Sequence, residues 1–321
     1  MSLLIAKESF GGSVNKLEMN LTITGSSGFI GQNLLQYLKN YQVTELTRQQ
    51  LNNPTIEQLS NSEAIIHLAG KAHDLKKTSN LDEYYQVNFE LTKKLYDAFL
   101  KSDAKKFIFI SSVKASADSV NGILTEENEP NPQTDYGKSK LMAEQYIQAQ
   151  ELPVGKSYYI LRPCMIHGPG NKGNLNLLYQ FVQKGIPYPL ATFENKRSFL
   201  SIENLCFVIQ QLLKKDIKSG VYNVADDEVL STNDVVKILA QASHKKAKLW
   251  KIPSTFIKKL ANVGDVLRLP LNSERLQKLT ESYVVSNAKI KAALQISLPV
   301  NTAEGLMITA KSFSTPTLGP K

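Results

Sequence analysis

The sequence predicts an α/β protein in which a Rossmann-type doubly wound parallel sheet is joined to a smaller C-terminal α/β region. Residues 20–150 alternate short β-branched or aliphatic runs with longer amphipathic stretches, which is the pattern of repeated βαβ units. Three glycines, at positions 25, 28 and 31, directly follow the first of these runs. After residue 164 Gly and Pro become denser and the alternation stops, so we expect a second region with a different organisation there.

Six short segments rich in β-branched and aliphatic residues predict the strands of the sheet. Their positions are residues 20–25, 42–47, 63–69, 105–112, 156–163 and 220–226. The third of these, EAIIHLA, is apolar enough to lie buried inside a sheet. Apolar residues at helical spacing and good capping residues predict helices over residues 33–40, 84–102, 134–147 and 231–243.

Composition limits the environment and the partners of the chain. No apolar run approaches the roughly 20 residues of a membrane-spanning helix, and Lys7 and Glu8 interrupt the apolar start too early for a signal peptide. The two cysteines, Cys164 and Cys206, have no metal-type spacing and fit a reducing compartment. We therefore expect a cytoplasmic protein without a metal site or a membrane span. The net charge is +9, but the Lys and Arg residues look dispersed, which argues against nucleic acid as a partner.

The glycines lie in TGSSGFIGQNLL, residues 24–35, between a predicted strand and a predicted helix. This arrangement cradles a pyrophosphate: Gly25 permits the tight turn, Gly28 lets the backbone approach the ligand, and Gly31 lets helix and strand pack closely. The helix N-terminus adds unpaired N–H groups and a positive dipole end. The segment therefore predicts a dinucleotide site that includes Phe29 and Ile30.

The end of the second strand bears on the choice of dinucleotide. An acidic residue at this place usually holds the ribose 2′-hydroxyl of NAD, whereas an Arg accommodates the 2′-phosphate of NADP. The strand ends VTELTRQQ, so Thr47 and Arg48 occupy the position and favour NADP. NAD is the alternative, with Glu45 reaching the ribose and Arg48 on the surface.

The pair Tyr136 and Lys140 lies in DYGKSK, inside the predicted helix 134–147. Residues four apart share a helix face, so the lysine ammonium is expected to lower the pKa of the phenol and to let Tyr136 exchange a proton near neutral pH. Ser111 and Ser112 end the strand FIFISS, at the carboxyl edge where open α/β sheets bind ligands. A serine there can orient a substrate hydroxyl or carbonyl.

These motifs resemble the extended short-chain dehydrogenase/reductases, the NAD(P)-dependent nucleotide-sugar epimerases, dehydratases and reductases. The resemblance covers nearly all of residues 20–305. It rests on TGSSGFIG (24–31), HLAG (67–70), VN (87–88), FIFISS (107–112), YGKSK (136–140), LRPCMIHGPG (161–170) and RSFLSIENL (197–205).

The resemblance implies roles for individual residues. Tyr136 is expected to be the acid/base, Lys140 its modulator and a ribose ligand, and Ser112 the residue that hydrogen-bonds the reacting oxygen. Further cofactor contacts are expected from Leu68, Ala69, Gly70, Asn88 and Pro163. Asn174 and Arg197 resemble groups that bind the phosphates of a nucleotide sugar. His73 is a candidate for a substrate hydroxyl, although a polar loop residue is the alternative.

Two departures from the family pattern concern the site. Gly70 stands where many relatives have a second alanine, a change that should leave room for the cofactor. The loop after the serines reads VKASAD, residues 113–118, in place of the common Val-Tyr-Gly. It also lacks the Asp-Glu pair that related dehydratases use, which disfavours dehydration.

Two reactions remain open, both with hydride transfer at C4 of a nucleotide sugar, expected to be a UDP-sugar. The NADP-type strand end favours a reductase of 4-keto-6-deoxy sugars in the synthesis of surface-polysaccharide precursors. The alternative is a 4-epimerase of the UDP-glucose or UDP-GlcNAc type with bound NAD. A non-catalytic NADP-binding regulatory protein is a third interpretation, disfavoured because Ser112, Tyr136 and Lys140 are all present. Relatives often form homodimers through the helix that carries Tyr and Lys, and residues 142–150 have a face suited either to such a homodimer or to packing in the protein's own core.

The predicted organisation has four parts. Residues 1–18 form a leader that we expect to be disordered, and residues 19–165 form the NAD(P)-binding Rossmann domain. Residues 166–305 are mainly the substrate-binding region, with some elements returning to the Rossmann sheet. Residues 306–321 are a C-terminal tail.

Overall fold

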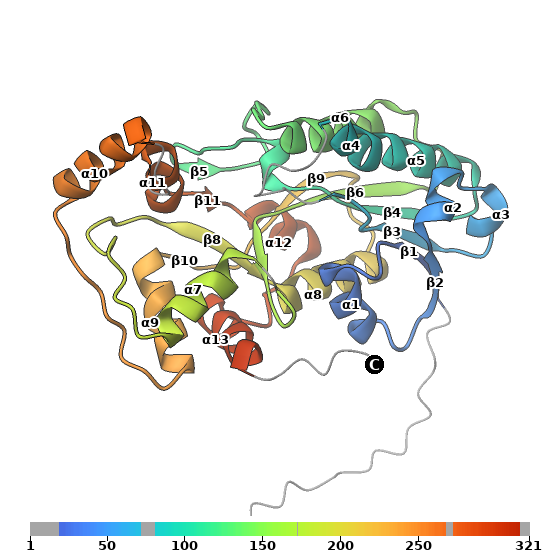
Figure 1. Cartoon of the computed structure of the whole chain (residues 1–321). Coiled ribbons are helices and arrows are strands. Elements are labelled where there is room, and N and C mark those ends of the chain that lie inside the picture. Colours follow the sequence, from blue (N-terminus) through green and yellow to red (C-terminus); the bar gives the residue numbers. More distant parts are fainter. Residues whose placement is uncertain (1–18, 72–80, 172, 268–271, 315–321) are drawn as a thin grey trace, which may run out of the picture.

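The structure, a computed structural model, describes residues 19–71, 81–171, 173–267 and 272–314 (Figure 1). Its central element is a sheet of six strands in the order β2-β1-β3-β4-β6-β9, and every neighbouring pair is parallel. The strands are β1 Asn20–Thr24, β2 Gln42–Leu46, β3 Ala64–His67, β4 Lys106–Ile110, β6 Ser157–Pro163 and β9 Gly220–Val224. Each predicted strand segment supplies one of them, which confirms the Rossmann-type α/β fold.

Helices cover both faces of this sheet, as a doubly wound fold requires (Figure 1). Side chains alternate along each strand, so Phe107 and Phe109 of β4 pack on one face while Ile108 and Ile110 pack on the other. The first face is covered by α5 Leu91–Lys101 and α6 Asp135–Ala149, and the second by α1 Phe29–Tyr37 and α8 Ile202–Lys214.

The predicted helix 84–102 is continuous in space but not uniform. It consists of α4 Leu81–Tyr84, the π-helical segment η1 Tyr85–Glu90 and α5. The buried Asn88 lies in this π-helical segment, whose turns are wider than those of an α-helix. Two short helices, α2 Arg48–Asn52 and α3 Ile56–Leu59, fill the connection between β2 and β3.

Smaller sheets organise the rest of the chain. One has the order β10-β8-β7, from Val229–Leu230, Arg197–Ser201 and Met165–His167. The other pairs β5 Ile123–Leu124 with β11 Val284–Val285. The accompanying helices are η2 Val113–Ala115, α7 Asn174–Gln183, α9 Thr232–Ala242, α10 Ser254–Leu267, α11 Ser273–Thr280, α12 Ala288–Leu294 and α13 Thr302–Ser314.

Elements of the C-terminal part of the chain contribute to two hydrophobic cores. A second hydrophobic core joins α7, α9 and α13 to β8, whereas β9 and α8 pack with the N-terminal sheet. Residues 306–314, predicted as the start of a tail, instead form most of α13, and Leu306 and Ala310 are buried. Thr and Ser interrupt the apolar positions of this segment, so its helical periodicity is weak in the sequence. Among the described helices, none combines the length and the apolarity needed to cross a bilayer.

Candidate active site

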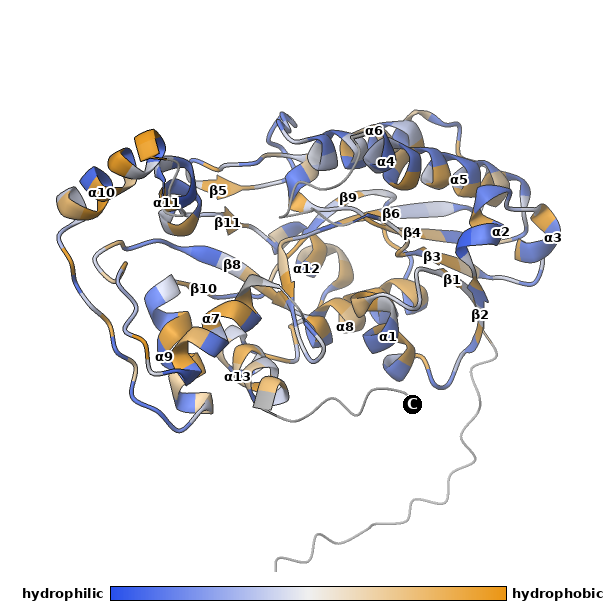
Figure 2. Cartoon of the chain, viewed as in Figure 1, coloured by the Kyte–Doolittle hydropathy of each residue, from blue (hydrophilic) through white to orange (hydrophobic). Residues whose placement is uncertain are grey.

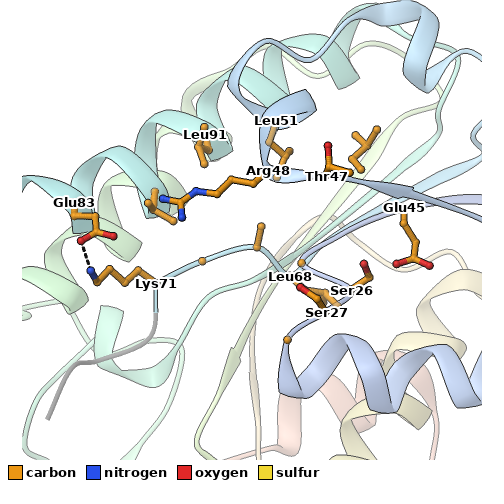
Figure 3. Close-up of a pocket in the computed structure, with 16 residues that line it drawn as sticks. Ser26, Ser27, Glu45, Thr47, Arg48, Leu51, Leu68, Lys71, Glu83 and Leu91 are labelled. Atoms are coloured by element: carbon orange, nitrogen blue, oxygen red, sulfur yellow. Dashed lines mark hydrogen bonds and ion pairs between the residues drawn. The ribbon is translucent and has the colours of Figure 1, made fainter. Parts of the chain in front are cut away.

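A cavity of about 610 Å³ opens at the carboxyl edge of the sheet, beside β1 (Figure 3). The chain runs from β1 to β2 on one side of β1, and then crosses to β3 on the other side of β1. This edge is therefore the topological switch point where such sheets bind ligands. The loop after β1, the end of β2, the residues after β3 and the η1–α5 helix line it. Its volume lies within the range of ligand and cofactor sites.

The glycine loop forms the floor of the cavity. Gly25 has a φ of +71°, and a Cβ there would lie 2.6 Å from the backbone nitrogen of Ala69. A Cβ on Gly31 would lie 2.5 Å from the carbonyl oxygen of Gly25. Both positions therefore require glycine, and Gly28 begins α1 without a side-chain cap, leaving N–H groups at the helix terminus. The loop fits the pyrophosphate of a dinucleotide.

Two charged side chains from the end of β2 line the cavity. Arg48 extends from α2 toward the side of Leu91, whereas Glu45 lies on the side of Ser26 (Figure 3). Thr47 caps α2 in a reciprocal capping box with Gln50, which fixes the direction in which Arg48 leaves the strand. The cavity therefore offers both a cation and a carboxylate to the adenosine end of a dinucleotide.

Ser112 and Tyr136 meet at the end of β4. Thr134 caps α6 through the Gly137 N–H, so Tyr136 lies in the first turn of the helix. The Tyr136 and Ser112 hydroxyls are hydrogen-bonded, and Ser112 Oγ also accepts from the Lys114 N–H at 3.2 Å. The Ser112 and Tyr136 hydroxyls therefore lie together at the carboxyl edge of the sheet.

Lys140 lies one turn further along α6 and is buried. Its Nζ donates to the Ile110 carbonyl at 2.9 Å and lies 4.8 Å from the centre of the Phe109 ring. Burial lowers the pKa of Lys140 to about 8, although the Glu144 carboxylate opposes the shift. The helix spacing thus brings Tyr136 and Lys140 to the same edge of the sheet.

The expectation for the pKa of Tyr136 is wrong in this state of the protein. Burial raises the pKa of the phenol, the Ser112 hydrogen bond only partly offsets this, and the neighbouring Tyr84 adds to the rise. The sequence pattern predicted a lowered pKa from Lys140, but the ammonium is bonded to a main-chain carbonyl instead. Loss of solvent around the phenol therefore outweighs the helix-face neighbour.

Asn88 fixes the chain beside the cavity. Its side chain accepts from the Lys71 N–H at 2.7 Å and donates to the Lys71 carbonyl and to Ser139 Oγ, both at 3.1 Å. A Cβ on Gly70 would lie 3.0 Å from Lys140 Nζ and 3.1 Å from Asn88 Oδ1. A side chain at position 70 would therefore crowd Lys140 and Asn88, and Gly70 itself lines the cavity.

A buried charge network behind Lys140 was not anticipated. The carboxylate of Glu144, one turn after Lys140, accepts from Arg162 Nε at 3.0 Å and from Nη2 at 2.5 Å. Ser111 donates a short hydrogen bond to the same carboxylate. The available signal was an acid four residues after Lys140 and an arginine inside the apolar strand β6.

The remaining predicted residues lie at various distances from this centre. Pro163 ends β6 and is buried opposite Val224. Leu68 and Ala69 line the cavity, whereas Phe29 and Ile30 pack against the hydrophobic core beneath the loop.

Of the predicted substrate residues, Asn174 and Arg197 belong to the C-terminal region, whereas Ser112 and His73 do not. Arg197 begins β8, and its guanidinium donates to the carbonyls of Lys278 and Glu281, the latter at 3.2 Å. Partial burial lowers its pKa. Asn174 is the first residue of α7, with its side chain outside the description, and His73 lies outside the described residues.

The glycine cradle, the cavity and the Ser112–Tyr136 pair with the buried Lys140 fit an NAD(P) dinucleotide and a proton-transfer group beside it. Comparison with known proteins agrees. Residues 21–225 match the family model "NAD dependent epimerase/dehydratase family". A UDP-glucose 4-epimerase of Vibrio cholerae is 31% identical, over 93% of this chain and 96% of the relative. An N-acetyl-α-D-glucosaminyl-diphospho-undecaprenol 4-epimerase of Escherichia coli O157:H7 is 29% identical, over 85% of this chain and 84% of the relative.

The fold also agrees with a solved structure. The UDP-N-acetylglucosamine 4-epimerase of Bacillus cereus superposes with a TM-score of 0.75 at 23% identity, covering 93% of this chain and 100% of that one. The match to the family model over most of the chain and the identity with a relative of nearly the same extent lead to one conclusion. The chain belongs to the NAD-dependent epimerase/dehydratase family, whose members act on nucleotide sugars and form part of the extended short-chain dehydrogenase/reductases.

Proposed function

We propose that this enzyme is a 4-epimerase of a UDP-sugar. The observation that carries the proposal is the 31% identity with a UDP-glucose 4-epimerase, which extends over nearly the whole of both chains. A second relative of similar identity is also a 4-epimerase. This changes the preference drawn from Arg48 alone, which favoured a 4-ketoreductase.

The residues at the sheet edge supply what hydride chemistry at C4 needs from the protein. A bound nicotinamide would accept a hydride from the sugar and return it to the opposite face. The glycine loop and the N-terminus of α1 would hold the pyrophosphate, while Glu45 or Arg48 would bind the adenosine ribose. Each of these residues lines the cavity or borders it.

Proton transfer falls to Tyr136. Its pKa is raised, and in the neutral form the phenol can donate to an oxygen that develops negative charge. To take the proton of the 4-hydroxyl, Tyr136 would have to be a phenolate, and the positive charge of the Lys140 ammonium on the same helix would stabilise that form. Ser112 hydrogen-bonds Tyr136, and in this proposal it would hold the same substrate oxygen.

A 4-ketoreductase using NADPH is the second candidate, favoured by one observation. The guanidinium of Arg48 lines the cavity at the end of β2, where a 2′-phosphate would be recognised. A reductase would exchange its cofactor at every turnover, whereas an epimerase returns the hydride and retains it.

The two candidates are separated by the nucleotide that the purified protein carries. The released nucleotide is identified by mass spectrometry, and the protein is then assayed with UDP-glucose, UDP-GlcNAc and a UDP-4-keto-6-deoxy sugar. Stoichiometric NAD together with interconversion of 4-epimers supports the epimerase. Protein without nucleotide that consumes NADPH with the keto sugar overturns it in favour of the reductase.

A further inference from the structure

Helix α10 exposes a continuous apolar stripe to solvent. Phe256, Leu260, Val263 and Leu267 are 55%, 47%, 48% and 63% exposed. Their spacing of four, three and four residues aligns them along one side of the helix. Another side carries Ile257, Ala261 and Gly264, which are buried against the protein. The helix is therefore already packed, and the α10 stripe (Phe256, Leu260, Val263 and Leu267) is additional to what the fold requires.

The α10 stripe forms one end of the molecule. Figure 1 shows α10 and α11 at the outer end of the C-terminal region, and Figure 2 shows hydrophobic residues along α10 there. A protruding apolar row of this kind marks a surface that meets an apolar partner.

The segment that leads into α10, and α10 itself, are rich in exposed lysine. The exposed lysines are Lys245, Lys246, Lys248, Lys251, Lys258 and Lys259, and no Asp or Glu occurs from residue 235 to residue 264. On α10, Lys259 lies beside the stripe, whereas Lys258 and Asp265 lie on the opposite side of the helix. Lys251 and the 57% exposed Trp250 come shortly before the helix.

We propose that α10 docks the protein on the surface of an anionic lipid bilayer. A helix with an apolar stripe and lysines beside it lies in the plane of the interface, with its apolar side chains at the acyl boundary. Lysines attract anionic headgroups and can extend along the helix to reach them. A protein partner fits less well, because lysine is depleted in protein–protein interfaces.

Docking through α10 would bring the predicted substrate region to the membrane. Helix α10 packs on α11, and the Lys278 carbonyl in the last turn of α11 accepts from Arg197. The bilayer would then lie one helix layer from the residue that we expect to bind substrate phosphates. A substrate with a lipid-linked diphosphate, or a membrane enzyme that consumes the product, would be reached directly.

Vesicle binding of the full chain tests the proposal. Sedimentation is measured with vesicles of phosphatidylcholine alone and with vesicles of phosphatidylcholine and phosphatidylglycerol in equal amounts. We expect the protein to sediment with the anionic vesicles and to be partly released by added salt. The Phe256→Ser/Leu260→Ser variant should lower the partition coefficient at least about tenfold. The Lys258→Gln/Lys259→Gln variant should lower it severalfold, for anionic vesicles only.

The control removes two exposed apolar side chains at the other end of the molecule. Ile56→Ser/Val154→Ser should bind vesicles as the unmodified protein does, since Ile56 and Val154 belong to the Rossmann half. Circular dichroism checks folding, and Leu267→Ser replaces the double variant if the latter unfolds. The proposal is overturned if the unmodified protein stays in the supernatant with both vesicle types, or if the stripe variants sediment unchanged. It is also overturned if the stripe variants lose self-association in light scattering but keep their vesicle binding, because a second copy of the chain would then cover the stripe.

Discussion

The two halves of the candidate site are held by the protein in different ways. Ser112 follows β4, a strand of the six-stranded sheet, and Tyr136 and Lys140 lie on α6, which packs on that sheet. Lys140 is buried. Arg197 begins a five-residue strand of a small sheet and is tied to two main-chain carbonyls near the surface. The sheet and α6 therefore hold the groups that we propose for proton transfer, whereas a short strand presents the arginine that we expect to bind substrate. This division lets one fold keep its chemistry while its substrate changes.

The largest expected effect is a loss of kcat, and it distinguishes the two halves of the site. Tyr136→Phe removes the proton-transfer hydroxyl and should lower kcat by about 10²–10⁴-fold, with dinucleotide retained. Arg197→Ala should instead raise KM for the UDP-sugar about tenfold and change kcat little, because it removes binding energy that is the same in ground state and transition state. Steady-state kinetics and the released nucleotide provide both measurements. Near-normal turnover of Tyr136→Phe, or a kcat loss in Arg197→Ala as large as that in Tyr136→Phe, contradicts the division.

The same division governs how much of the structure could be predicted from the sequence. Alternating apolar runs located all six strands, and the four-residue spacing of Tyr136 and Lys140 placed them at the same sheet edge, because these features depend on local periodicity. The pairing of Glu144 with Arg162 joins residues on different elements, and no local pattern specifies such a contact. The raised pKa of Tyr136 escaped prediction for a related reason, since the packed structure determines burial.

A buried ion pair of the first half can be compared with an exposed ion pair of the second, because each contains a glutamate. Glu144 is fully buried and pairs with Arg162, whereas Glu274 is exposed and pairs with Lys278 four residues along α11. Glu144→Gln leaves the Arg162 charge buried without its counter-ion, and we expect a loss of about 3–5 kcal/mol in the free energy of unfolding. The matched variant Glu274→Gln should lose less than about 0.5 kcal/mol. Urea unfolding measures both, and equal losses would mean that Arg162 is compensated by other groups.

The smallest expected effect is a change in cofactor affinity, and it concerns the exposed Arg48 beside the glycine loop. Arg48 lines the cavity from the start of α2, so Arg48→Ala should weaken NADPH binding about tenfold if the guanidinium meets the 2′-phosphate. NADH binding should change little, because that ribose presents no phosphate. Glu45→Gln is the matched variant: if Glu45 holds the ribose hydroxyls, it weakens NADH instead. Fluorescence titration of nucleotide-free protein with both cofactors measures the four affinities. Equal losses of NADH and NADPH in Arg48→Ala would mean that Arg48 acts on the shape of the cavity, and the choice of cofactor would then rest with Glu45.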